Sequence, residues 1–181
     1  MIGWTLTGII FFIKPGYGDA YKQLAVKTYP IEKSITIAPQ SDWQEIRLVQ
    51  TILGKHILVK VNGSVQHLDA NSFMPTQLPS EDALKTLIDD AISHNRTRYG
   101  KVLSYSDGLA QTTTGVEVTL DWQSLRLSQK GGDTQLINTL YKIHYLQWTS
   151  NSVLNQILGI AGLILLFSLT VLGIRLTIKR R

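Results

Sequence analysis

Four histidines carry most of the chemistry that this sequence could support, and His144 stands out because it lies next to an apolar segment. The chain of 181 residues has no cysteine, which excludes disulfides, iron–sulfur clusters, zinc–thiolate sites and thiol nucleophiles. In a helix, His144 would share a face with Leu140 and Trp148, four residues to either side. A histidine at that position could ligate haem b close to a membrane surface.

Ligand counting favours a structural role for His144 over haem binding. A six-coordinate haem needs two strong axial ligands, and neither apolar segment of the chain contains a second histidine. A symmetric homodimer could supply His144 from each of two chains. We therefore expect no cofactor and a partly buried histidine that bonds a backbone group, with haem ligation by His144 as the alternative.

His56 and His67 form a second candidate pair. His56 opens one predicted strand and His67 lies within the next, so they could face each other across the hairpin whose turn is Asn62-Gly63. Two imidazoles alone are too few ligands for a zinc site. No G-x-S-x-G motif occurs, and the polar loop 112–115 lacks the lysine of a phosphate-binding loop. We expect no metal site and no catalytic site, and we predict that the protein is not an enzyme.

The net charge of +5 comes from a short C-terminal segment. Residues 175–181 contain Arg175, Lys179, Arg180 and Arg181 and no acidic residue, which leaves 14 basic and 13 acidic residues elsewhere. A nucleic-acid-binding surface requires clustered basic residues. The charge distribution therefore argues against nucleic acid as a partner.

A continuous apolar segment from Val153 to Ile174 predicts a transmembrane helix. It carries no charge and would span about 33 Å as a helix, against a hydrocarbon thickness of about 30 Å. Basic residues follow at once, and such residues favour the cytoplasmic side of a membrane. The sequence thus predicts a transmembrane helix over 153–175 and a basic cytoplasmic tail over 176–181.

The N-terminal segment is also apolar, but it is shorter. Residues 2–13 would make about 18 Å of helix, and a Lys-Pro-Gly sequence at 14–16 ends the segment. We interpret residues 1–14 as the second half of a first transmembrane helix, whose start would need an upstream codon that adds about 6–10 residues. The alternative is a short, tilted helix in a locally thinned bilayer. With both termini cytoplasmic, residues 15–152 would lie outside the membrane on the far side.

Hydrophobic periodicity in residues 15–152 predicts an α+β domain. Alternating apolar and polar residues predict strands, and apolar residues on one helical face between Ala83 and Ile92 predict an amphipathic helix capped by Ser80. A second such helix would begin at Asp133 and lead into the membrane. The predicted strands are 45–53, 56–61, 64–68, 101–105, 115–120 and 125–127, and the predicted helices are 17–26, 80–94 and 133–148.

Two nine-residue stretches resemble each other, HLDANSFMP at 67–75 and TLDWQSLRL at 119–127. In each, a strand that ends in Leu-Asp precedes a turn that contains serine and then a bulky apolar residue. Asp69 and Asp121 can accept hydrogen bonds from the backbone of these turns. Because this local role is sufficient, we interpret both aspartates as turn formers rather than as metal ligands or catalytic groups.

The second stretch, together with the residues that follow it, resembles the PepSY-associated transmembrane proteins of bacteria. The likeness rests on VEVTLDWQSLRL (116–127), LYKIHYLQW (140–148) and LNQILGIAGLILLFSLTVLGIRL (154–176), and GWTLTGIIFFIKPGYGDAY (3–21) is similar to the end of that family's first membrane helix. The resemblance implies an inner-membrane protein with a periplasmic PepSY-like domain. Such domains occur in the propeptides of metallopeptidases, where they inhibit the peptidase. In larger relatives, histidines of further membrane helices ligate haem and reduce iron carriers.

These features together predict a non-enzymatic protein of the inner membrane, with an α+β PepSY-like domain in the periplasm between two transmembrane helices. Its expected task is binding or regulation, of an envelope peptidase or of a membrane redox partner. Its expected partners are the lipid bilayer and a membrane or periplasmic protein, with a homodimer as a further option. The alternative is a subunit of a haem-dependent metal-uptake or ferric-reductase-like system that uses His144.

Overall fold

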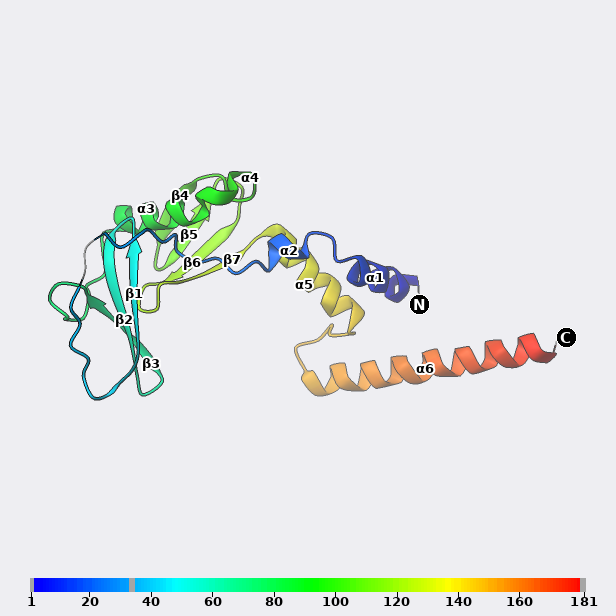
Figure 1. Cartoon of the computed structure of the whole chain (residues 1–181). Helices are drawn as coiled ribbons and strands as arrows, with labels where there is room; N and C mark the ends of the chain where they lie inside the picture. Colours follow the sequence, from blue (N-terminus) through cyan, green and yellow to red (C-terminus); the bar gives the residue numbers. More distant parts are fainter. Residues whose placement is uncertain (1, 33–34, 180–181) are drawn as a thin grey trace. The chain divides into compact units, whose positions relative to one another are not determined.

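The structure, a computed structural model, describes residues 2–32 and 35–179. The chain divides into two compact units, one formed by Asp19–Gly132 and the other by Met1–Gly18 together with Asp133–Arg181. The first unit holds two antiparallel sheets with their helices, and the second is built from helices (Figure 1). The fold is thus mixed α+β with an apolar C-terminal helix, as the sequence predicts.

The first sheet is a three-stranded antiparallel meander. Its strands are β1 (Trp43–Thr51), β2 (Gly54–Val61) and β3 (Ser64–Asp69), in the order β1-β2-β3. The turn between β2 and β3 is Asn62-Gly63, and both of its residues have positive φ angles, of 49° and 82°. These angles are those of a type I′ turn, whose twist matches that of paired strands. The Asn-Gly sequence therefore sets this hairpin.

Helix α3 (Glu81–Ile92) follows the first sheet and turns one face into the core. The Ser80 hydroxyl caps it by accepting a hydrogen bond from the Ala83 N–H at 3.4 Å, and acidic residues in the first turn complement the helix dipole. Its buried residues are Leu84, Leu87, Ile88, Ala91 and Ile92. Two short helical segments, η1 (Ser93–Asn95) and α4 (Arg96–Tyr99), lead on to the second sheet.

The second sheet has four antiparallel strands in the order β4-β5-β6-β7. They are β4 (Val102–Ser106), β5 (Leu109–Thr112), β6 (Glu117–Asp121) and β7 (Arg126–Lys130). Strand β5 is not among the predicted strands. The turn that precedes it, Asp107-Gly108, has φ angles of 48° and 82° and is therefore a second type I′ turn. Strand β7 extends beyond the predicted 125–127 because it pairs along its whole length with β6.

Two apolar clusters form the core of the α+β unit. The larger cluster joins Val49 and Leu58 of the first sheet to the apolar face of α3 and to residues of the second sheet, among them Val118 and Trp122. The smaller cluster is centred on Ile57 and lies on the opposite face of the first sheet, because neighbouring residues of a strand alternate in direction. The face that carries Val49 and Leu58 is therefore the one on which the two sheets meet.

In the helical unit, α1 (Ile2–Ile13) contacts α5 (Gly132–His144). The rings of Phe11 and Tyr141 stack with their centroids 4.5 Å apart. Helix α2 (Tyr17–Ala20) is much shorter than the predicted helix 17–26. The chain leaves the helical conformation after it, and Ala25 instead forms a bridge with Arg126 of β7. Pairing with the sheet edge thus prevails over the weak helical pattern of this segment.

Helix α5 ends at His144, four residues before the predicted end. Leu146 has a positive φ of 55°, and the Gln147 N–H donates to the Lys142 carbonyl at 2.8 Å. This hydrogen bond and the left-handed residue make the helix stop that glycine usually provides. The predicted helix 133–148 is therefore wrong in its last turn, because no glycine or proline in the sequence marks this stop.

The loop between α5 and α6 (Ser152–Lys179) is held by Asn155, from the first turn of α6. Its Oδ1 accepts hydrogen bonds from the Thr149 N–H at 3.0 Å and the Thr149 hydroxyl at 2.9 Å. Its Nδ2 donates to the Thr149 carbonyl at 2.7 Å. Both polar atoms of this amide are thus bonded within the chain.

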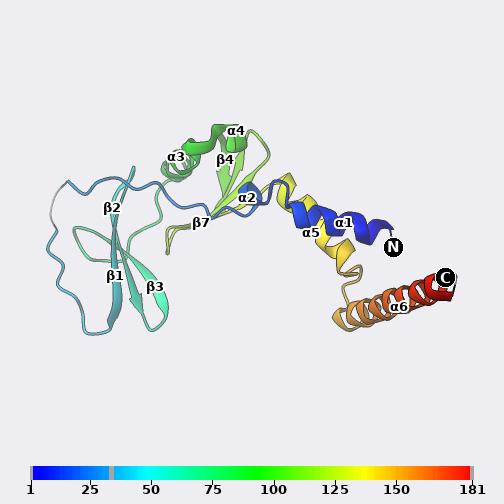
Figure 2. The same cartoon turned by 45° about the vertical axis from the view of Figure 1, so that its right-hand side comes forward.

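Helix α6 is one uninterrupted helix of 28 residues (Figures 1 and 2). Its apolar 18-residue window has a mean hydropathy of 2.6, and none of that window is buried. Over residues 2–32 and 35–179 it is the one helix long and apolar enough to cross a membrane. A helix that is apolar all round and unburied is unfavourable in water and suits a membrane. The predicted helix 153–175 is thus present, whereas α1 has 12 residues and reaches about 18 Å.

Candidate functional site

Two buried histidines meet on the face where the two sheets pack together. His56 lies on β2 and His67 on β3, and they are diagonal neighbours on one face, since His56 pairs with Asp69 and His67 with Leu58. His56 Nδ1 lies 2.9 Å from His67 Nε2, so the predicted facing of the two rings is confirmed. The exposed fraction is 6% for His56 and 1% for His67.

The histidine pair belongs to a continuous hydrogen-bonded chain. At one end Thr51 Oγ1 lies 2.8 Å from His56 Nε2, and at the other end His67 Nδ1 lies 2.8 Å from the carbonyl oxygen of Trp122. The Leu53 N–H also donates to Thr51 Oγ1, at 3.1 Å. The chain thus links the end of β1 through β2 and β3 to the turn between β6 and β7.

The carbonyl at the end of this histidine chain determines where its protons lie. A carbonyl only accepts, so neutral His67 carries its proton on Nδ1 and presents a lone pair on Nε2. His56 then donates from Nδ1 to His67 and accepts at Nε2 from the Thr51 hydroxyl. A further proton on His67 Nε2 would oppose the N–H of His56, and one on His56 Nε2 would force the hydroxyl to turn from donor to acceptor. The bonding pattern therefore favours two neutral rings.

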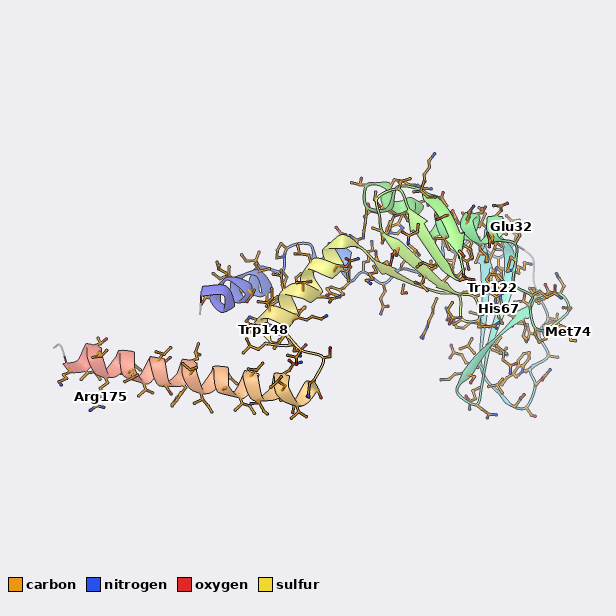
Figure 3. The ribbon with its side chains drawn as sticks, turned by 180° about the vertical axis from the view of Figure 1, so that it is seen from behind. Glu32, His67, Met74, Trp122, Trp148 and Arg175 are labelled. Atoms are coloured by element: carbon orange, nitrogen blue, oxygen red, sulfur yellow. The ribbon has the colours of Figure 1, made fainter. Side chains whose placement is uncertain are left out.

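Burial disfavours the charged form of both imidazoles. The Trp122 ring lies against both of them, with its centroid 4.5 Å from that of His67 and 5.6 Å from that of His56. Figure 3 shows Trp122 beside His67. Desolvation lowers the pKa of His56 to about 4, with a further lowering from His67 and an opposing effect of Asp69. Desolvation also lowers the pKa of His67, against the effect of its bond to the Trp122 carbonyl. The pair is uncharged at neutral pH.

His144 lies at the end of α5, in contact with α1. Its Nδ1 lies 2.9 Å from Oγ1 of the buried Thr7. The rings of Phe11 and Tyr145 approach it edge-on, at centroid distances of 5.0 and 5.3 Å. A Cβ atom at Gly8 would lie 3.7 Å from the imidazole, an ordinary van der Waals distance, so the ring lies beside α1 at this glycine. The site is a helix–helix contact built on one histidine.

The carboxylates of the two repeated stretches hold their own turns, as predicted. Asp69 Oδ1 accepts from the Ser72 N–H at 2.8 Å and from the Ser72 hydroxyl at 2.9 Å. Asp121 accepts from the Gln123 N–H at 3.0 Å and from the Ser124 hydroxyl at 2.5 Å. Hydrogen bonds from its turn lower the pKa of Asp69. Both side chains therefore stabilise the backbone locally.

The two repeated stretches also share an unusual backbone conformation. Phe73 and Leu125, which occupy the same position of the repeat, have positive φ angles of 58° and 51°. In both stretches the residue before the aspartate pairs with the residue seven positions further on. Bulky residues rarely adopt positive φ, so its occurrence at matching positions confirms the repeat as a structural one.

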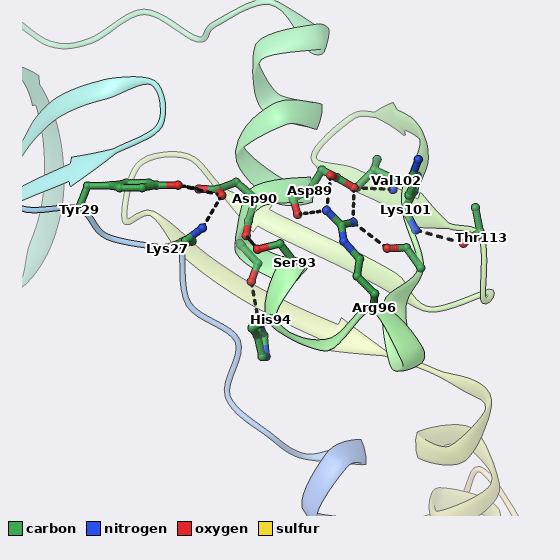
Figure 4. A network of polar contacts seen from close by, with 12 residues as sticks. Lys27, Tyr29, Asp89, Asp90, Ser93, His94, Arg96, Lys101, Val102 and Thr113 are labelled. Carbon is green, nitrogen blue, oxygen red and sulfur yellow. Dashed lines mark hydrogen bonds and ion pairs between the residues drawn. The ribbon is translucent and has the colours of Figure 1, made fainter.

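Two adjacent carboxylates on α3, Asp89 and Asp90, are candidates for acid–base chemistry by position, but both are engaged (Figure 4). Arg96 donates to the two oxygens of Asp89 at 2.7 and 2.6 Å, and the Val102 N–H donates to it at 3.1 Å. The Arg96 guanidinium holds the pKa of Asp89 below its usual value. Asp90 accepts from the Tyr29 hydroxyl at 2.9 Å. These contacts fasten α3 to β4 and to the segment that precedes β1.

A polar groove of about 530 Å³ lies between the first sheet and the turn after β6. Charged residues of both signs line it, but most of them lie opposite one another in the strand pairing. Glu45 pairs with Lys60, and Asp121 pairs with Arg126. Opposite charges at such positions attract each other across a sheet. Arg47 is the remaining cation of the described lining, so the groove is not a strongly charged site.

Over residues 2–32 and 35–179, no three histidine, aspartate or glutamate side chains form a group that could hold a metal ion. The fold and the site therefore define a class, an α+β domain joined to a helix that is long and apolar enough to cross a membrane. Comparisons with protein-family models, with curated proteins and with solved structures find no match to this chain.

Sequence reasoning found the histidines but missed three of their partners, Thr51, Trp122 and Thr7. A signal for Trp122 was present, because it stands in the second repeated stretch where the first has Ala70. The two turns have the same geometry, so a large residue in one turn where the other has a small residue indicates a packing role for the large side chain. The contact of Thr51 with His56 follows from strand pairing across the β1–β2 hairpin, because Thr51 pairs with Gly54 and is a diagonal neighbour of His56. The contact of Thr7 with His144 depends on tertiary packing, and no spacing in the sequence predicts it.

Proposed function

We propose that this protein is a non-enzymatic binding or regulatory protein of the bacterial inner membrane, in which the α+β unit acts as a periplasmic PepSY-like domain. The observation that carries the proposal is the unburied apolar surface of α6 in a chain that also forms a separate α+β unit. The task of the domain would be to modulate an envelope peptidase or a membrane redox partner.

The residues at the two ends of α6 support anchoring with the C-terminus in the cytoplasm. Arg175 and Lys179 lie at its C-terminal end, and basic residues favour the cytoplasmic side. Tyr145 and Trp148 precede its N-terminal end and are 57% and 65% exposed, as expected of aromatic residues at a membrane surface. In this arrangement residues 15–152 lie in the periplasm, and α1 lies in the membrane.

Binding is supported over catalysis by the state of the polar side chains in the α+β unit. The histidine chain is closed by its own hydrogen bonds, and Asp69 and Asp121 hold their turns. A general acid or base must instead reach a proton of the substrate.

The absence of cysteine from the sequence makes the proposed topology directly testable. In intact cells a membrane-impermeant maleimide should label Ser128→Cys, at an exposed position of β7, whereas Lys179→Cys should need permeabilised cells. The cysteine-free parent chain is the matched control. Labelling in the reverse pattern, or release of the parent chain from membranes by alkaline carbonate, would contradict the proposal.

The regulatory role is tested with the full chain in nanodiscs. A photoreactive residue at Ser128 should crosslink a partner in native membranes, and the purified chain should then change the turnover of that partner. A crosslinked protein whose turnover is unaffected would contradict regulation. Turnover of peptide or ferric substrates by the purified chain alone would contradict a non-enzymatic role.

The alternative function, a subunit of a haem-dependent metal-uptake or ferric-reductase-like system, has one observation in its favour. His144 lies among aromatic rings, a setting that suits a porphyrin. Because Thr7 engages Nδ1, the haem iron would have to bind Nε2. A Soret band at one haem per two chains, abolished by His144→Ala, would favour this alternative over the first proposal.

A further inference from the structure

The buried histidine chain is a polar link across an otherwise apolar junction. The first sheet contributes Thr51, His56 and His67, and the second sheet contributes the carbonyl of Trp122. The larger core cluster that surrounds this link consists of apolar and aromatic residues. If the link breaks without opening the junction, buried polar atoms on both sides lose their partners, which is unfavourable.

The turn that carries Trp122 gains a hydrogen bond to water when it leaves the junction between the sheets. The indole Nε1 is buried and has no hydrogen-bond partner in the described part of the chain. A buried donor without an acceptor is unfavourable, and exposure to water would satisfy it. The turn is therefore held by its packing and by the bond from His67, and it is released more easily than a fully satisfied turn.

We propose that the chain from Thr51 through His56 and His67 to the Trp122 carbonyl is an acid-sensitive latch between the two sheets. The latch is closed while both imidazoles are neutral and opens when either becomes protonated, because the added charge would be buried in the apolar cluster and a further N–H would force the Thr51 hydroxyl to turn from donor to acceptor. Opening frees the turn 121–125. Asp121, Gln123 and Ser124 line the polar groove, so the shape of that groove changes with the state of the latch.

The charges around the pair define the direction of the response. Asp69 lies opposite His56 and favours its protonation, whereas burial and the neighbouring His67 oppose it. Helix α3 contributes apolar side chains to the same cluster. The other charged groups near this face are exposed to solvent: Glu45, Arg47, Lys60, Asp121 and Arg126. Burial thus prevails, and the latch is closed at neutral pH and opens progressively as the pH falls from about 6.5, the usual histidine pKa, toward the lowered pKa of His56, about 4.

Hydrogen–deuterium exchange of the full chain in detergent tests this latch. After correction for the intrinsic rates, the amides of 119–127 should exchange about tenfold faster at pH 5 than at pH 7, a change that corresponds to one pKa unit of linkage. The amides of the β4–β5 hairpin, whose turn is Asp107-Gly108, serve as an internal control and should keep their rate. Equal protection of 119–127 at both pH values would overturn the proposal.

A double variant without titratable groups separates the latch from general acid sensitivity. In His56→Gln/His67→Asn each amide N–H can still donate, but neither side chain titrates, so the acid response of 119–127 should vanish. The exposed His94 provides the matched control, and His94→Gln should retain the response. An unchanged acid response in the double variant would overturn the latch.

Nitrogen NMR of the wild-type imidazoles gives an answer that does not depend on how the variants fold. Both His56 and His67 should be neutral Nδ1–H tautomers at pH 7, the less common form of histidine in solution. A charged ring, or an Nε2–H tautomer at either position, would contradict the bonding pattern on which the latch rests.

Discussion

A threonine hydroxyl meets a histidine in both units of this protein, but the two contacts differ in what lies beyond the imidazole. In the helical unit Thr7 meets His144, and aromatic rings surround the pair. In the α+β unit Thr51 meets His56, and the bonding continues through His67 to a backbone carbonyl. The first contact joins two helices, and the second joins two sheets.

The difference shows how an acceptor at the end of a hydrogen-bonded chain determines the chemistry of the whole chain. A carbonyl cannot donate, so it selects one tautomer for each imidazole of the α+β unit, and burial disfavours an added proton on either ring. Buried networks of this kind are costly when one member fails. The contact between Thr7 and His144 joins two helices among aromatic rings, and we expect it to act as a structural joint. Each of the following predictions tests this contrast.

The largest effect is expected from removal of the side chain that covers the buried pair. Trp122→Ala should reduce the free energy of unfolding of the α+β unit by about 3–5 kcal/mol, because it empties a large core site and uncovers both imidazoles. Denaturant unfolding in detergent measures this loss. Trp148→Ala is the matched control, since Trp148 is 65% exposed and its loss should leave that stability within about 0.5 kcal/mol. Similar losses in both variants would remove the distinction between the units.

The second prediction concerns pH. The folded pKa of His56 is lowered to about 4, so the folded state binds fewer protons than the unfolded state between that value and the unfolded pKa of about 6.5. Its contribution to stability is complete above pH 6.5 and is lost as the pH falls toward 4, up to about 3 kcal/mol. Unfolding free energies at several pH values measure the slope. A flat profile over this range would contradict a neutral buried pair.

The joint between the helices should respond more weakly. His144→Ala should destabilise the helical unit by about 1–3 kcal/mol, and Thr7→Val by about 1 kcal/mol, because each removes one hydrogen bond. Thr7→Ser retains the hydroxyl and is the matched control. Thermal unfolding of this unit in nanodiscs gives the values, and an unchanged stability of both Thr7→Val and His144→Ala would show that the contact is dispensable.

The smallest effects are expected in the two repeated turns. Asp69→Ala and Asp121→Ala should each cost about 1 kcal/mol, because each removes hydrogen bonds at an exposed site. Asp69→Asn and Asp121→Asn keep an acceptor oxygen and should be close to neutral. The Asp121 variants should also increase hydrogen exchange at 119–127, because that turn belongs to the latch. An Asp69 variant with the larger effect on 119–127 would reverse the expected order.

Much of the α+β unit follows from local signals in the sequence. The Asn62-Gly63 turn, the cap at Ser80 and the apolar stripe of α3 predict their elements correctly, because each depends on residues close in the chain. The strand after Asp107-Gly108 could have been found by the same hairpin rule, and its short length concealed it. The stop of α5 at Leu146 could not, since a leucine at positive φ has no sequence signature.

The sequence predicts only part of the candidate site. The hairpin turn places His56 and His67 on one face of neighbouring strands, so their contact follows from strand pairing alone. The Trp122 carbonyl reaches them across 55 residues of chain, which no periodicity reports. Chemistry that depends on packing between two sheets therefore requires the structure, even where each sheet can be predicted.

The bonds of Asn155 to Thr149 have a consequence for the fit between α6 and a lipid bilayer. They hold the polar amide of the first turn of α6 against the loop before it, so the apolar length of the helix is set by residues 157–174. That length is about 27 Å, slightly less than a hydrocarbon core of about 30 Å. A helix that is shorter than the hydrocarbon core has a mismatch that tilting cannot relieve. Helix α6 would instead thin the surrounding bilayer slightly, and it would therefore fit best in membranes of below-average thickness.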